Sequence, residues 1–159
     1  MTDRMEVQRT IAAPAADIFA VLRDPYGHVA IDASGMLQDA DGDVVTSVGD
    51  TFVIHMDREA LNDYPLGKYD VTVEIREFEH DALISWTIVG QIKPDIGHVY
   101  GYRLEPSNDG GTVVTSFYDW SDIDPEWRKR DIFPIIPESA LRATLGVLDR
   151  TVRHGYPRG

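Results

Sequence analysis

The chain has 159 residues, no cysteine and a formal net charge of −12 at pH 7. The length suits a single domain covering 1–159, the lack of cysteine excludes disulfides and thiolate metal sites, and the negative charge argues against a nucleic-acid partner. No stretch approaches the ~20 apolar residues of a membrane span, and the charged start, MTDRMEVQR, does not resemble a signal peptide. We therefore expect a cytoplasmic protein with no stable membrane insertion.

The first part of the chain predicts a strand followed by one or two short helices. Residues 5–11 alternate between apolar and polar side chains, as a half-buried strand does. A helix should begin at Pro14, since proline suits the first helical turn, and its apolar face would consist of Ile18, Phe19 and Leu22. Asp24 should end it, because a residue before proline is pushed out of the α region. A second short helix or turn at 26–31 and a solvated acidic turn at 39–43 would follow.

From residue 44 to residue 120 the spacing of apolar side chains changes to two, which predicts strands. The turn sequence PSNDGG separates the last two of them. Short spacers favour antiparallel neighbours, because parallel pairs need long crossovers. The expected strands are 51–57, 69–76, 83–89, 99–104 and 112–120.

The last segment predicts a long helix. Pro137 should begin it, Glu138 suits the positive end of its dipole, and Gly155 should end it. Its apolar stripe consists of Leu141, Leu145, Leu148 and Val152. Six to seven antiparallel strands with a helix on one face make an α+β domain. A strongly curved sheet cannot press evenly on one straight helix, so we expect some interior volume.

Two segments of the chain resemble a known family. They are RTIAAPAADIFAVLRDP near the start and YRLEPSNDGGTVVTSFYDW before the last helix. Both are similar to the polyketide cyclase/dehydrase and lipid-transport group of the START-like (SRPBCC) superfamily, which includes the birch-pollen-allergen fold. The positions that match are Arg9, Ile11, Ala12, Ala13, Pro14, Ile18, Phe19, Asp24, Leu104, Pro106, Gly110, Gly111 and Thr112.

The resemblance implies a helix-grip fold, in which the curved sheet wraps around the long C-terminal helix and encloses a small-molecule cavity. The matching motifs specify a turn and a helix entry rather than chemistry, so function inferred from the fold is analogy. The segment 121–137 departs from the family pattern and gathers apolar side chains before the last helix. Its run Phe133–Ile136 could be a lid, a dimer contact or plain core.

No sequence motif specifies catalysis or a cofactor. The five histidines lack the close spacing of metal ligands, and no serine lies in a Gly-x-Ser-x-Gly elbow. The glycines have neither dinucleotide-binding nor Walker context. We therefore expect no metal and no cofactor.

Polar and aromatic side chains on neighbouring strands form a candidate ligand site. Strand alternation groups His98 with Tyr100 and Tyr102, and Ser116 with Tyr118 and Trp120. Such a lining of rings with a few hydroxyl and imidazole groups is typical of ligand pockets, although Trp86 and Trp120 would also fit an ordinary core. The candidate residues are Tyr69, Trp86, His98, Tyr100, Tyr102, Ser116, Tyr118, Trp120, Leu141 and Leu145.

A second polar group consists of His55, Asp57 and Arg58 at the end of one strand. His55 could line the interior with the candidate residues. It could equally face solvent, because Phe52, Ile54 and Met56 look like the buried set of that strand.

Three functions follow as hypotheses. The first is binding or transport of a hydrophobic small molecule, such as a lipid, fatty acid or polyketide-like compound. The alternative is a cofactor-independent aromatase/cyclase-type enzyme that moves protons with interior histidine and tyrosine groups. The third is an interaction module that uses the segment Trp127–Ile136 as an apolar patch. The oligomeric state, monomer or homodimer, is left open.

Overall fold

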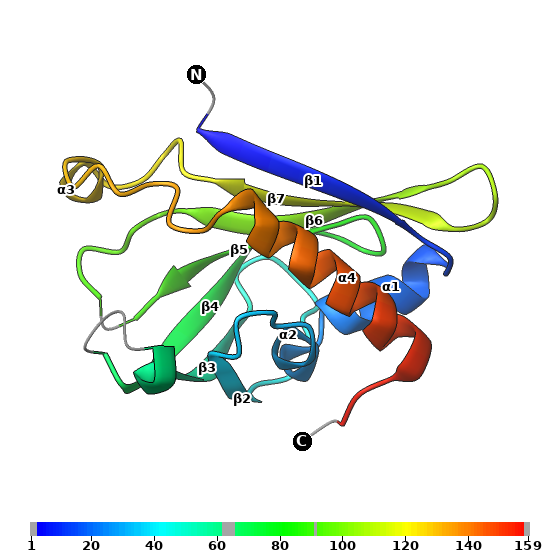
Figure 1. Ribbon diagram of the computed structural model, residues 1–159, viewed down its shortest axis with the longest axis horizontal. Helices are drawn as coiled ribbons and strands as arrows, with labels where there is room; N and C mark the ends of the chain where they lie inside the picture. Colours follow the sequence, from blue (N-terminus) through cyan, green and yellow to red (C-terminus); the bar gives the residue numbers. More distant parts are fainter. Residues whose placement is uncertain (1–2, 62–65, 91, 158–159) are drawn as a thin grey trace.

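The computed structural model describes residues 3–61, 66–90 and 92–157. Seven antiparallel strands form one open sheet in the order β1-β7-β6-β5-β4-β3-β2, so that β1 and β2 are its edges (Figure 1). The strands are β1 (Arg4–Ile11), β2 (Leu37–Asp41), β3 (Thr51–Asp57), β4 (Lys68–Glu79), β5 (Leu83–Val89), β6 (Val99–Pro106) and β7 (Thr112–Asp119). The helices are α1 (Ala15–Leu22), α2 (Pro25–Ala30), the 3₁₀ turn η1 (Glu59–Leu61), α3 (Pro125–Arg128) and α4 (Glu138–His154).

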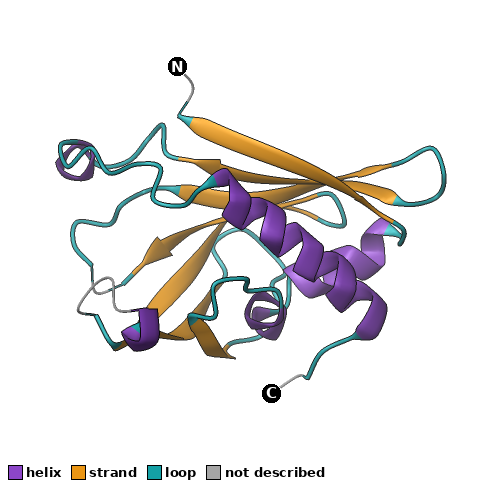
Figure 2. Cartoon of the chain, in the orientation of Figure 1, coloured by secondary structure: helices purple, strands orange, loops and turns teal. Residues whose placement is uncertain are grey.

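The long helix α4 lies across the concave side of the sheet, with α1 and α2 on the same side (Figure 2). It packs against β1, β7 and α1. Of the predicted stripe, Leu141, Leu145 and Leu148 are buried, and Val152 is partly buried. Pro137 and Gly155 cap it at the expected ends. The helix-grip architecture is therefore confirmed. None of the helices in the described part of the chain combines the length and the apolar character needed to cross a membrane.

The acidic segment 39–43, expected to be a solvated turn, instead contains most of the edge strand β2, so that expectation was wrong. Ala40 lies opposite Ile54 of β3 and is only 1% exposed, whereas the neighbouring aspartates face solvent. A single small residue facing the core is too weak a signal to reveal the strand. The turn begins at Gly42, where φ is 152° and an added Cβ would lie 2.5 Å from the Cβ of Phe52.

The register of the strands aligns side chains in rows across the concave face. In one row Trp86 of β5, Tyr100 of β6 and Tyr118 of β7 lie opposite one another, and Met5 of β1 continues it. A bulge in β4 between Ile75 and Glu77 breaks the regular pairing with β5; such bulges bend a strand and increase its twist.

Candidate functional site

Aromatic rings line the concave face along this row. The ring centroids of Trp86 and Tyr100 are 6.1 Å apart, and those of Tyr100 and Tyr118 are 4.8 Å apart with an interplanar angle of 28°. Trp120 continues the stack beyond the end of β7, 5.5 Å from Tyr118. The pairing of β5 with β6 and of β6 with β7 holds these rings side by side, because each side chain stands roughly perpendicular to the sheet.

His98 joins this row through a buried hydrogen bond. Its Nδ1 lies 2.8 Å from the hydroxyl oxygen of Tyr118, and the two side chains are 3% and 0% exposed. Burial penalises the charged imidazolium and lowers the pKa of His98 to about 4. Burial likewise raises the pKa of Tyr118, so the pair is uncharged at neutral pH.

A second row lies closer to α1 and is fully covered. Tyr102 lies between Ile84 and Ser116 in the register, and a hydrogen bond with Ser116 opposes the burial that raises the pKa of Tyr102. Leu141 and Leu145 of α4 are buried in the same core.

The inward-facing side chains become more exposed to solvent from one end of the concave face to the other. Near α1 the inward side chains are buried, as Ile84 and Leu104 illustrate. At the opposite end, next to the β3–β4 and β5–β6 loops, inward-facing side chains are only half-buried although they lie on the core face. We call this end the open end and define it by Tyr69, Trp86, Ile88, Tyr100 and Trp120.

A small apolar pocket reaches the open end. Its volume is about 70 Å³, which is less than the roughly 300 Å³ of the smallest common ligand sites. A molecule of drug size would therefore have to displace side chains or loops. The pocket is lined by Leu66, Tyr69, Asp70, Val71, Ile88, Val89, Gly90, Ile92 and Ile96.

The segment 121–137 lies beside this end and is attached to the β5–β6 loop. The indole Nε1 of Trp127 donates a 2.7 Å hydrogen bond to the carbonyl of Pro94, and the ring of Phe133 lies 6.2 Å from that of His98. Ile132 and Ile135 remain 48% and 43% exposed. The segment thus covers His98 with one side and presents aliphatic side chains to solvent with the other.

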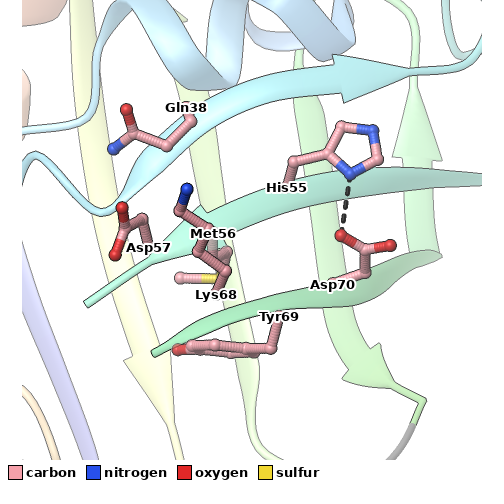
Figure 3. A pocket seen from close by; sticks show the side chains of 7 residues that line it. All are labelled: Gln38, His55, Met56, Asp57, Lys68, Tyr69 and Asp70. Atoms are coloured by element: carbon pink, nitrogen blue, oxygen red, sulfur yellow. Dashed lines mark hydrogen bonds and ion pairs between the residues drawn. The ribbon is translucent and has the colours of Figure 1, made fainter. Parts of the chain in front are cut away.

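A second, larger hollow of about 640 Å³ lies at the ends of β3 and β4 (Figure 3). His55 borders it on the outer face of the sheet, so the alternative that places this histidine in the interior was wrong. Its Nδ1 lies 2.7 Å from Asp70 and its Nε2 lies 2.6 Å from Asp41, and these two hydrogen bonds raise the pKa of His55 to about 9. The lining is mostly polar or charged and consists of Gln38, His55, Met56, Asp57, Lys68, Tyr69 and Asp70.

The ten candidate residues lie on β4, β5, β6, β7 and α4 or directly beside these elements, and their side chains belong to the concave side of the sheet. The sequence reasoning missed His28, whose ring lies 4.7 Å from that of Trp86 and 5.0 Å from that of Phe52. Burial lowers the pKa of His28 to about 4, and its Nε2 is hydrogen bonded to the carbonyl of Leu22. The pattern of apolar and polar residues in the α2 segment does not indicate that this short helix turns His28 towards the sheet. Within the described residues, no three histidine or acidic side chains are arranged to hold a metal ion.

The curved sheet, the helix on its concave side and the aromatic face between them define a helix-grip protein. The sequence profile of polyketide cyclase/dehydrase and lipid transport proteins matches residues 2–153, and the chain belongs to that family. No curated protein matches the chain significantly.

Solved structures with the same fold share little sequence with the chain. Norcoclaurine synthase from Thalictrum flavum, in complex with dopamine and hydroxybenzaldehyde, is 18% identical with a TM-score of 0.64, covering 99% of this chain and 90% of that one. A Deinococcus radiodurans protein is 19% identical with a TM-score of 0.63, covering 96% and 99%. The Aha1 dimer from Colwellia psychrerythraea is 15% identical with a TM-score of 0.61, covering 97% and 98%. At such identities the likeness concerns the fold alone.

Proposed function

We propose that the protein binds a hydrophobic small molecule between the open end of the concave face and α4. The observation that carries this proposal is the incomplete burial of Trp86, Tyr100 and Trp120 on a face that is otherwise core. Aromatic surface left partly exposed inside a concave fold is stabilised when an apolar molecule covers it. Norcoclaurine synthase, a neighbour with the same fold, has been solved in complex with two aromatic compounds.

The ligand would lie against the aromatic row and extend into the apolar pocket beside Ile88. Because the pocket volume is about 70 Å³, side chains or loops at the open end must move outward to admit a larger molecule. The segment 121–137 is the candidate for this movement, since it lies beside the open end and is attached to the β5–β6 loop by the Trp127–Pro94 and Asp124–Ile96 hydrogen bonds.

Fluorescence of N-phenyl-naphthylamine, an uncharged apolar dye, provides the test. We expect saturable binding to the wild-type protein and a loss of at least about tenfold in affinity for Ile88→Trp, which fills the apolar pocket. Val53→Trp adds the same ring on the outer face of β3 and serves as the matched control. Mass spectrometry of an organic extract of natively purified protein would identify a resident ligand. No saturable binding by the wild-type protein, together with no ligand in the extract, would overturn the proposal.

The His98–Tyr118 pair supports a second candidate, a cofactor-independent cyclase-type enzyme. A phenol and an uncharged imidazole 2.8 Å apart could orient and protonate a carbonyl oxygen. The pKa of about 4 makes His98 a weak base at neutral pH, however, and an efficient general base has a pKa near the working pH. This candidate therefore ranks second.

Deuterium exchange tests the second candidate. An aromatic β-diketone incubated with the protein in deuterated buffer should exchange its α-protons faster than in buffer alone, and His98→Gln and Tyr118→Phe should abolish the acceleration. Exchange at the buffer rate with wild-type protein would remove the enzyme hypothesis while leaving the binding proposal intact.

A further inference from the structure

The residues that define the open end carry only neutral polar groups, and Asp70, which also lines the apolar pocket, is hydrogen bonded to His55. Tyr100 and Tyr118 stack at 4.8 Å, and His98 is hydrogen bonded to Tyr118. Burial raises the pKa of Tyr100, and Tyr69 at the start of β4 lies close enough to add to this effect. Tyr69 and Tyr100 are half-buried, whereas His98 and Tyr118 are fully buried. A ligand that covers the half-buried rings would therefore meet the hydroxyl groups of Tyr69 and Tyr100 first.

Charged side chains are rare on the concave face. Among the strand residues, all of which the structure describes, Arg9 is the one charged side chain in the inward rows, and its Nε lies 2.9 Å from Asp149 of α4. Arg9 is opposite Val114, four positions along β7 from Tyr118. That separation is roughly 13 Å at the usual rise per strand residue, so this guanidinium is both paired and distant from the aromatic row.

Several basic side chains near the open end have partners of their own. Arg128 donates to Asp3 and to the carbonyl of Trp120, and Lys93 is paired with Asp95. Lys129 is paired with Glu126 and the guanidinium of Arg130 lies over the ring of Trp127. Lys68 precedes Tyr69 on β4 and belongs to the outward-facing set with Asp70. It lines the larger hollow and not the apolar pocket.

We propose that the ligand of this site is uncharged, with hydroxyl or carbonyl oxygens on an apolar skeleton, and that the site discriminates against carboxylates such as fatty acids. This inference rests on the proposed function and narrows it. Burying a carboxylate without a cation or several donors is costly. The same low-polarity surroundings lower the pKa of His98 and raise those of Tyr100 and Tyr118, so they oppose charge of either sign.

Matched probes test this discrimination. β-Naphthol, β-naphthoate and naphthalene share one ring skeleton and differ in the oxygen group and its charge at neutral pH. Each is titrated as a displacer of N-phenyl-naphthylamine from the wild-type protein. We expect naphthol to displace the dye at a concentration at least about tenfold lower than naphthoate, and somewhat lower than naphthalene.

Phenylalanine variants separate recognition of the oxygen from general hydrophobicity. Tyr100→Phe and Tyr69→Phe should weaken naphthol several-fold and leave naphthalene unchanged. Tyr156→Phe removes a hydroxyl at the C-terminal end of the chain, hydrogen bonded to Asp24, and is the matched control. Melting temperatures of all three variants verify that they fold.

The outcomes distinguish this inference from the proposed function. Equal or tighter binding of naphthoate, or a selective loss of naphthoate binding in Lys68→Met, would overturn the inference and leave hydrophobic binding standing. Naphthol binding that Tyr100→Phe and Tyr69→Phe leave unchanged would also overturn it. Failure of the dye itself to bind, together with an extract that contains no ligand, would overturn the proposed function and this inference together.

Discussion

The ring of Phe117 in β7 covers Gly101, its cross-strand partner in β6, on the convex face of the sheet. An added Cβ on Gly101 would lie 2.3 Å from Cζ of Phe117 and 2.9 Å from the backbone oxygen of Ile84. Phe117 is only 2% exposed although it lies on the outer face, and the guanidinium carbon of Arg4 is 4.2 Å from its ring centroid. The glycine therefore provides the space in which the ring is buried.

Gly101→Ala should destabilise the protein by roughly 1–3 kcal/mol, because the ring must leave its position or the strands must separate. Urea denaturation monitored by circular dichroism measures the change. Gly146→Ala in α4 is the control, since an added Cβ there meets nothing within 4 Å; it should stabilise the helix by about 0.5–1 kcal/mol. Equal effects of the two substitutions would contradict the packing argument.

Acid should destabilise the fold through His28. The pKa of this buried imidazole is lowered from 6.5 to about 4, so between those values the unfolded chain binds a proton that the folded protein does not. The stabilising contribution is fully present above pH 6.5 and is lost as the pH falls towards 4, by about 3 kcal/mol for this shift. Urea midpoints across this range, compared with His28→Gln, measure it.

The imidazole resonances provide an independent check of this prediction. His28 should titrate with a pKa of about 4 in the folded protein. The acid limb of the stability curve should become flatter in His28→Gln and remain unchanged in His154→Gln, where the exposed histidine lies in the last turn of α4. A normal titration of His28 near its unperturbed pKa would show that the ring is hydrated.

Base should destabilise the edge of the sheet through His55. Its hydrogen bonds with Asp70 and Asp41 raise its pKa to about 9, so the folded state holds this proton more tightly than the unfolded chain does. The contribution of protonated His55 to the free energy of unfolding is fully present below pH 6.5 and is lost as the pH rises through 9. The protection factors of the β2 amides, which correct for the base-catalysed intrinsic exchange rate, should therefore fall over this range in the wild-type protein.

His55→Gln should remove this alkaline fall in the protection factors, because the amide side chain does not titrate. Asp41→Asn should reduce it, since Asp70 remains as a partner. Identical pH dependence of β2 exchange in wild-type protein and His55→Gln would count against the link between the two strands.

The positions of the strands and the faces of their side chains were predictable because the alternation is strong. Tyr100 and Tyr102, for example, face α4 as their spacing from Leu104 requires. The edge strand β2 was not predictable, because Ala40 is its one buried side chain. Without β2, the contact between His55 and Asp41 could not be foreseen either.

The partners within the candidate site depend on register, which single-strand patterns do not contain. His98 and Tyr118 are 20 positions apart, and their hydrogen bond requires β6 and β7 to pair so that Tyr100 is opposite Tyr118. Turn length and bulges set that alignment. The partial exposure of the aromatic row likewise depends on how α4 and the 121–137 segment cover the sheet, which no local pattern determines.

The C-terminal residues after α4 are joined to the start of α2 through Tyr156. Its hydroxyl donates a 2.6 Å hydrogen bond to Oδ2 of Asp24, while Oδ1 of that carboxylate accepts from the amide of Tyr26 and caps α2. Asp24 is 4% exposed, so loss of one donor leaves a buried carboxylate less well solvated. Tyr156→Phe should therefore cost roughly 1–3 kcal/mol of unfolding free energy. A double-mutant cycle with Asp24→Asn isolates the pair. The losses of unfolding free energy in the two single variants should sum to clearly more than the loss in the double variant, because either change alone removes the charge-assisted hydrogen bond. Strictly additive losses would show that Tyr156 acts through packing alone.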